Sequence, residues 1–166
     1  MTRVPFIATL LLTLLGLLAT TTACNDDSCY DNGSSLPLAS FYVGSQHQEI
    51  SGLTIVGIGA PGDSLLADSA TLNEAYLPLR ASASTTSYAL SRWVTIGSSR
   101  VYLRDTLTID YQPIEFFHSV ECGAMFNFNI QRLGTTCHGI DSVVLLTPLI
   151  TNSPTTALRI YFTDFQ

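Results

Sequence analysis

The alternation of apolar and polar residues at every second position is the feature that most constrains the fold of this chain. Leu107, Ile109 and Tyr111 lie on one face of such a stretch, and polar residues occupy the other face. The same pattern recurs at residues 126–130 and 158–162. A period of two is typical of antiparallel strands that pack on one side and meet water on the other. These three stretches therefore predict strands of a half-buried sheet.

Shorter runs of apolar and β-branched residues, separated by turn residues, lie at 41–43, 53–55, 77–79, 88–96 and 101–103. Gly-Ser-Ser at 97–99 predicts a hairpin turn. Residues 143–146 are apolar throughout, which predicts a central strand buried on both faces. No window sustains helical periodicity over three turns. The patterns together predict an all-β fold, an immunoglobulin-like antiparallel β-sandwich of seven to eight strands.

Residues 1–23 have the features of a lipoprotein signal peptide. Arg3 supplies a positive charge, residues 6–19 are uncharged, and small residues at 20–23 precede Cys24. The apolar run is too short to span a bilayer comfortably. A cysteine at the cleavage point is similar to a bacterial lipobox, in which Cys24 is lipidated and becomes the mature N-terminus. Thr21 departs from the usual leucine, and an ordinary signal peptide cut near Ala23 remains the alternative.

Residues 24–35 are expected to form an acidic polar tether, and residues 36–166 a single β-sandwich domain. The tether carries Asp26, Asp27, Asp31 and Asn32, which raises the hypothesis of a calcium loop. Counting back from Gly33 does not give the oxygen ligands that a calcium loop of the EF type needs. A solvated linker is the simpler interpretation.

The charge of the chain limits its partners. All seven basic residues are arginine, and the formal net charge of −6 becomes −7 once Arg3 is removed with the signal peptide. An acidic surface without a basic stripe argues against nucleic acid and against anionic lipid headgroups. Membrane association is therefore expected to come from the lipid on Cys24.

The four cysteines follow export into an oxidising space. With Cys24 acylated, Cys29, Cys122 and Cys137 leave one pair and one unpaired thiol, and all three pairings stay open. The chain has neither a CxxC spacing nor an HxxxH pair, so no metal site is expected. No cofactor is expected either.

Two motifs with catalytic associations overlap at residues 57–65. Residues 57–62 satisfy G-x-G-x-x-G, but a dinucleotide site needs a helix to begin there, and Pro61 and Gly62 interrupt the chain. Residues 62–65 spell Gly-Asp-Ser-Leu, the nucleophile block of one class of esterases. Ser64 would then need a histidine base late in the chain within Asp-x-x-His, which this sequence lacks. Both motifs are more simply explained as a loop.

A second nucleophile hypothesis joins Cys137, His138 and Asp141. Neighbouring residues on a strand point to opposite faces, so Cys137 and His138 are not expected to meet. His47 and His118 are lone histidines, expected in a loop and at a strand end. A small envelope hydrolase that uses Ser64 or Cys137 remains the alternative to a non-catalytic protein.

Six aromatic residues are candidates for a binding face: Tyr42, Tyr88, Trp93, Tyr102, Tyr111 and Tyr161. Exposed aromatic side chains stack on sugars or anchor protein partners. Most aromatic residues of a sandwich belong to its core, so both roles stay open for each of the six. The partner of such a face is expected to be an envelope protein or a glycan.

Short motifs are spread over residues 24–162: Cys24 followed by Cys29, Phe41-Tyr42, Asp63-Ser64-Leu65-Leu66, Leu77-Pro78-Leu79, Asp105-Thr106-Leu107-Thr108-Ile109 with Tyr111, Glu121-Cys122-Gly123, and Leu158-Arg159-Ile160-Tyr161-Phe162. In these motifs the chain resembles a Bacteroidota lipoprotein family of unknown function, whose members are small single β-domains behind a lipobox. The resemblance implies an envelope location and a β-fold, and it implies no activity. Cys137 and residues 92–104 depart from the family pattern.

We therefore expect a lipid-anchored, non-catalytic binding or accessory domain at the outer membrane or elsewhere in the cell envelope, either periplasmic or surface-exposed. We also expect a Cys29–Cys122 disulfide, with Cys137 outside it, because the tether would otherwise enter the sandwich unconstrained. Closing a loop of about 93 residues stabilises the fold by roughly 4–5 kcal/mol in the chain-entropy model. A Cys122–Cys137 bridge, closing about 15 residues for nearer 3 kcal/mol, is the rival pairing.

Overall fold

The computed structural model describes residues 35–60, 64–119 and 123–165. Contacts within the chain group the described residues into one compact unit. The predicted signal peptide, Cys24, Cys29, Cys122 and the acidic residues of the tether lie outside the described residues. The strands are β1 (Leu38–Val43), β2 (Gln46–His47), β3 (Ile50–Ile58), β4 (Leu65–Leu72), β5 (Glu74–Tyr76), β6 (Thr85–Ile96), β7 (Ser99–Ser119), β8 (Gly123–Thr135), β9 (Ile140–Leu145), β10 (Leu149–Ile150) and β11 (Thr156–Phe162).

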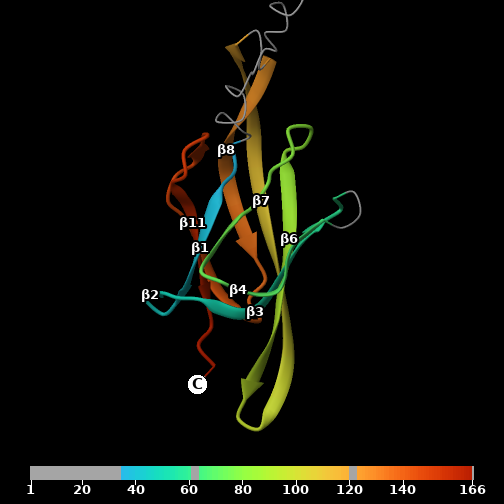
Figure 1. Ribbon diagram of the computed structural model, residues 1–166, viewed down its shortest axis with the longest axis vertical. Coiled ribbons are helices and arrows are strands. Elements are labelled where there is room, and N and C mark those ends of the chain that lie inside the picture. The colour runs from blue at the N-terminus through green and yellow to red at the C-terminus, as the bar shows by residue number, and fades with distance from the viewer. Residues whose placement is uncertain (1–34, 61–63, 120–122, 166) are drawn as a thin grey trace, which may run out of the picture. The chain divides into compact units, whose positions relative to one another are not determined.

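These strands form two sheets that enclose one core (Figure 1). The first sheet has the order β2-β1-β11-β9, and β5 also pairs with β1. The second sheet has the order β10-β8-β7-β6-β3-β4. The predicted all-β sandwich is confirmed. Eight strands have six residues or more, within the expected seven to eight, but β4 and the short strands β2, β5 and β10 were not predicted.

One pair of strands departs from the expected antiparallel arrangement. β1 and β11 run parallel, with Phe41 opposite Ile160. Phe41 also meets Phe162 edge-on, with ring centroids 5.6 Å apart. The alternation of residues within a strand shows which face is buried and not the direction of its neighbour, so the sequence could not reveal this pairing.

The core consists of the side chains that the alternation placed on the apolar faces. Leu107 and Ile109 of β7 are fully buried, and Tyr111 is 2 % exposed. Phe128 of β8 meets Tyr111 edge-on, with ring centroids 5.4 Å apart. The inward residues of β11 are equally buried. The three longest alternating stretches are therefore confirmed as one-sided strands.

Two predictions about apolar runs are wrong. Residues 143–146 were predicted as a central strand, but β9 lies at the edge of the first sheet, where Val144 is 42 % exposed and Leu146 41 %. A short apolar run is the same on a buried and on an edge strand, and here alternate residues face the core. Residues 77–79 were predicted as a strand, yet they follow β5 outside any strand, and Leu77 is buried as a loop residue.

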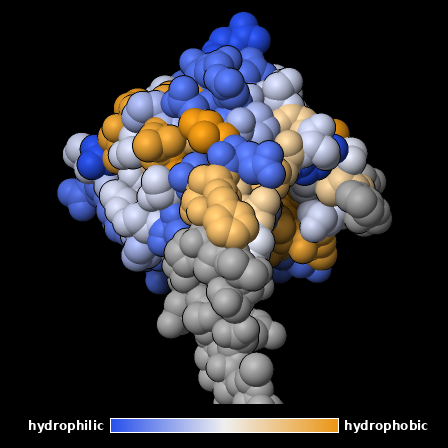
Figure 2. Space-filling model, turned by 90° about the horizontal axis from the view of Figure 1, so that it is seen from above, coloured by the Kyte–Doolittle hydropathy of each residue, from blue (hydrophilic) through white to orange (hydrophobic). Residues whose placement is uncertain are grey.

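Hydrophobic residues at the surface are scattered. Figure 2 shows separate hydrophobic patches between hydrophilic residues on the face that it presents, and no continuous hydrophobic surface there. The described part of the chain contains no helix long and apolar enough to cross a membrane.

Candidate ligand-binding site

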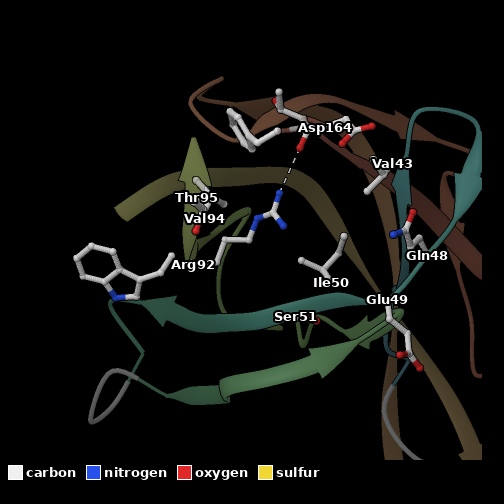
Figure 3. A pocket seen from close by; sticks show the side chains of 12 residues that line it. Val43, Gln48, Glu49, Ile50, Ser51, Arg92, Val94, Thr95 and Asp164 are labelled. Atoms are coloured by element: carbon white, nitrogen blue, oxygen red, sulfur yellow. Dashed lines mark hydrogen bonds between the residues drawn. The ribbon is translucent and has the colours of Figure 1, made fainter. Parts of the chain in front are cut away.

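A groove of about 410 Å³ opens at one end of the sandwich, between the two sheets (Figure 3). Its walls come from the end of β1, the start of β3, residues 92–95 of β6 and the segment after β11. We call it the Arg92 groove. Its lining residues are Val43, Gln48, Glu49, Ile50, Ser51, Arg92, Trp93, Val94, Thr95, Thr163, Asp164 and Phe165.

The groove exists because β6 extends beyond its neighbour β3. The pairing of β3 with β6 ends at Thr54 and Ser91, whereas β6 stays paired with β7 as far as Ile96 and Ser99. Gly52 has φ = +67°, in the left-handed region that favours glycine, and here the pairing of β3 with β4 also shifts register. β3 therefore leaves β6 early and exposes residues 92–95 to the groove.

Arg92 is the principal charged group of the groove. In Figure 3 its side chain extends toward the segment after β11, where Nη2 donates to the Thr163 carbonyl oxygen at 3.3 Å. The guanidinium carbon lies 5.2 Å from the centre of the Phe162 ring. Burial lowers the pKa of Arg92. Nε is buried without a hydrogen-bond partner among the described residues, so this cation is incompletely compensated.

The other polar groups of the groove are suited to hydroxyl-rich ligands. Gln48, Ser51 and Thr95 offer an amide and two hydroxyls, and Glu49 and Asp164 offer carboxylates. In Figure 3 the carboxylate of Glu49 points away from the guanidinium of Arg92. The groove thus presents a cation, neutral donors and acceptors, and carboxylates around one space.

Beyond the groove, β6 and β7 form a two-stranded hairpin that closes at Gly97 and Ser98. Gly97 has φ = +61°, as a tight hairpin turn requires, and the predicted turn is confirmed. Trp93 and Tyr102 pair across the strands, with ring centroids 5.1 Å apart, and are 55 % and 49 % exposed. The guanidinium carbon of Arg100 lies 5.0 Å from the centre of the Trp93 ring.

The pairing register places one further arginine on the same face of this hairpin, because Arg104 follows Tyr102 by two positions on β7. Trp93, Arg100, Tyr102 and Arg104 together are called the hairpin patch. Trp93 also lines the Arg92 groove, so the patch and the groove are continuous. Trp93 and Tyr102 were predicted from the sequence as candidates for a binding face, whereas the basic surface was not predicted.

A signal for the basic surface exists in the sequence. Residues 75–104 contain four arginines and no aspartate or glutamate, in a chain whose formal net charge is −6. Three of these arginines lie within residues 92–104. A count of charge by window would have identified it.

Ser64 lies exposed beside a separate, mainly apolar cleft of about 350 Å³. The described residues that line this cleft include no histidine and no carboxylate: Gly57, Ile58, Ala60, Ser64, Leu66, Pro78, Leu79, Arg80, Thr86 and Tyr88. Burial and the neighbouring Tyr111 raise the pKa of Tyr88, against a smaller effect of Arg80, and the Tyr88 hydroxyl donates to the Pro78 carbonyl.

Of the glycines in the G-x-G-x-x-G motif, Gly57 lies near the end of β3, Gly59 follows this strand, and Gly62 lies outside the described residues. Gly57 N–H donates to the Ser64 carbonyl oxygen at 2.9 Å, and the chain then continues as strand β4. Residues 65–72 thus form a strand where a dinucleotide site would need a helix.

The structure does not bring Cys137 and His138 together as a catalytic pair. Both lie in the loop between β8 and β9, so the premise that they share a strand was wrong. Cys137 is an exposed free thiol. His138 Nδ1 lies 3.1 Å from Oδ1 of Asp105, and Asp141 accepts a hydrogen bond from Thr163 Oγ1 at 2.7 Å.

Asp105 is a buried carboxylate whose structural role was not predicted from the sequence. It is 2 % exposed, and its carboxylate accepts hydrogen bonds from the backbone N–H groups of His138, Gly139 and Ile140 at 2.7–3.0 Å. Thr136 Oγ1 donates a further bond at 2.8 Å. Burial raises the pKa of Asp105, but these hydrogen bonds outweigh it and leave the pKa below its usual value. Asp105 thus fixes the β8–β9 loop to β7.

The remaining candidate residues lie in the core, contact other aromatic rings, or fall outside the described residues. Tyr88 and Tyr111 are buried in the core. Tyr42 and Tyr161 lie 5.3 Å apart, measured between ring centroids, and Tyr42 and His47 are equally close. The side chain of His118 and the cysteines Cys24, Cys29 and Cys122 lie outside the described residues. Within the described ranges, no group of three or more potential metal ligands converges.

Comparison with known proteins places the chain in a family. Neither the curated proteins nor the solved structures contain a match. A family model described as a family of unknown function, DUF6452, matches residues 52–162, which is more than half of the chain. The match begins inside β3 and ends with the last residue of β11, so it includes the hairpin and most of the sandwich. The chain therefore belongs to this family of unknown function, DUF6452.

Proposed function

We propose that this protein is a lipid-anchored, non-catalytic binding domain of the cell envelope, and that its ligand is a saccharide held in the Arg92 groove. The observation that carries the binding role is the guanidinium of Arg92. It is desolvated, and its described partners are one backbone carbonyl and one aromatic ring. The ion pairs of the described residues, Arg132–Asp110 and His138–Asp105, do not include it. An incompletely compensated cation in a groove is typical of a functional site.

The chemistry around Arg92 supports a saccharide as the ligand. Sugar hydroxyls both donate and accept hydrogen bonds, and the amide, hydroxyl and carboxylate groups of the groove can satisfy both roles. Trp93 contributes an aromatic surface, against which the C–H face of a sugar ring packs. A volume of about 410 Å³ falls within the range of small-molecule sites.

The surroundings of the candidate nucleophiles support a non-catalytic role. Ser64 lines a cleft without a described base, and the imidazole of His138 contacts Asp105. The alternative, a small hydrolase, is tested by screening the protein against ester, amide and glycoside substrates beside its Ser64→Ala and Cys137→Ala variants. Turnover that either substitution abolishes would replace our proposal.

Anchoring rests on residues 1–23 and on Cys24. We predict that the mature protein begins at an acylated Cys24, and that Cys24→Ser leaves it soluble or unprocessed. Mass spectrometry of the N-terminal peptide is the measurement. A mature N-terminus at another residue, or an unacylated Cys24, would contradict the anchor.

Binding in the groove is tested through fluorescence, because Trp93 is the single tryptophan of the chain. The full-length lipoprotein in detergent is titrated with neutral trisaccharides of glucose and of N-acetylglucosamine. We expect saturable changes in the emission of Trp93 that weaken about tenfold in Arg92→Gln, which equals about 1.4 kcal/mol.

Arg159→Gln is a matched control for this titration. Arg159 also has a buried Nε without a described partner, and its guanidinium lies 5.1 Å from the centre of the Tyr42 ring. It does not line the groove. Equal losses in both variants would assign the effect to the fold and overturn the groove as the binding site.

A further inference from the structure

We infer that the ligand is an acidic polysaccharide, whose neutral portion occupies the Arg92 groove while its acidic groups bind the hairpin patch. This inference rests on the proposed function and adds the chemical class of the ligand. Arg100 and Arg104 supply two cations at one exposed face, on a chain whose formal net charge is −6. Such local charge complementarity selects an anionic partner.

The composition of the hairpin patch favours a polysaccharide over other anions. Trp93 and Tyr102 are both about half exposed and lie side by side, with Arg100 at the Trp93 ring. Aromatic rings offer apolar faces to sugar rings, and arginine binds carboxylate or sulfate groups through paired N–H donors. A sugar chain that carries acidic groups uses both kinds of contact at one surface.

The charged residues of the groove and of the hairpin patch indicate which part of the ligand each surface binds. Glu49 and Asp164 line the groove together with Arg92, so the groove carries charges of both signs and does not select an anionic group. The hairpin patch lies outside those carboxylates and is joined to the groove through Trp93. A neutral sugar unit in the groove therefore places its acidic neighbour beside Arg100.

The hairpin patch lies far along β7 from the first described residue of the domain. Ser35, where the described chain begins, donates to Asn127 on β8, which pairs with Ile114 of β7. Tyr102 lies twelve residues before Ile114 on the same strand, a span of about 40 Å at the usual rise of a strand. The patch and the start of the domain thus lie at opposite ends of β7, as Figure 1 shows for the two hairpins that this strand joins.

The test immobilises the full-length lipoprotein and measures binding of polygalacturonate, alginate and heparin. Methyl-esterified polygalacturonate and dextran are the neutral comparisons. We expect at least one acidic polymer to bind at least about tenfold more tightly than the neutral polymers at 50 mM NaCl, and to weaken as NaCl rises. Trp93→Ala should weaken this binding about tenfold or more, and Arg100→Gln about threefold to tenfold.

Arg132→Gln is the matched control, because it removes the same charge from an exposed arginine of β8, which pairs with Asp110. Equal losses in Arg132→Gln and Arg100→Gln would show that only net charge matters and overturn the inference. Equally tight binding of polyglutamate, of single-stranded DNA or of vesicles with phosphatidylglycerol would also overturn it.

The same measurements separate this inference from the proposed function. If neutral trisaccharides bind and acidic polymers bind no better than dextran, the acidic ligand is wrong and the groove stands. If acidic polymers bind through Trp93 and Arg100 while Arg92→Gln has no effect, the patch stands and the groove is wrong. If no saccharide binds, both proposals fail.

Discussion

At the scale of single residues, Asp105 shows how a charge can be buried without a full ionic partner. Three consecutive backbone N–H groups and one hydroxyl donate to its carboxylate, so the hydrogen bonds replace much of the lost hydration. The donors come from a loop more than thirty residues away in sequence. No local pattern around Asp105 indicates that contact, and it was therefore beyond the reach of the sequence analysis.

We predict that Asp105→Asn destabilises the fold by about 2–4 kcal/mol at neutral pH, because charge-assisted hydrogen bonds are lost in a buried site. Urea unfolding measures this free energy. Asp110→Asn is the control, since Asp110 also accepts hydrogen bonds from a threonine and a basic residue but at the surface, and its effect should be small.

The effect of Asp105 should depend on pH in a stated direction. Its folded-state pKa lies below the usual value, so the stabilisation is complete above about pH 4, the pKa of an unfolded aspartate. It is lost as the pH falls through the lower folded-state pKa. The comparison uses the His138→Gln variant and the double variant that also carries Asp105→Asn. Their free energies of unfolding should therefore converge as the pH falls below about 4. A difference that stays constant from pH 7 to pH 3 would refute a charged Asp105.

At the scale of the elements, the strands that alternate clearly were predictable and the uniformly apolar strand was not. Leu107, Ile109 and Tyr111 alternate with polar neighbours, and that contrast identifies the buried face from sequence alone. Residues 143–146 lack the contrast, so an edge strand could not be told from a central one. The hairpin patch was missed for a different reason: its residues meet only through the register that the turn at Gly97 sets.

The edge position of β9 gives a prediction about neighbouring valines. Val143 packs against the core and Val144 is 42 % exposed. Val143→Ala should destabilise the fold by about 1–2 kcal/mol, whereas Val144→Ala should stay within about 0.5 kcal/mol. Equilibrium unfolding of the two variants shows whether β9 lies at the edge or at the centre of the first sheet. Similar losses for both would mean that β9 is buried on both faces.

At the scale of the whole described domain, the first and last long strands complete the sandwich together. β1 and β11 pair in parallel at the centre of the first sheet, so the fold needs both ends of the domain. The long strand β7 belongs to the second sheet, and its first residues form the hairpin beside the groove. The class of fold and one aromatic candidate, Trp93, could be predicted from the sequence. The groove could not be predicted, because it forms where β6 extends beyond its pairing with β3.

The most direct test of the central claim is an NMR titration of the protein with a saccharide that binds in the fluorescence assay. The single indole N–H reports Trp93, and the backbone amides report the rest of the chain. We predict shifts that saturate together at Trp93, Arg92, Thr95 and Ser51, with none around Ser64 or Cys137. Shifts that centre on Ser64 or Cys137 and leave the Trp93 indole unmoved would contradict the account.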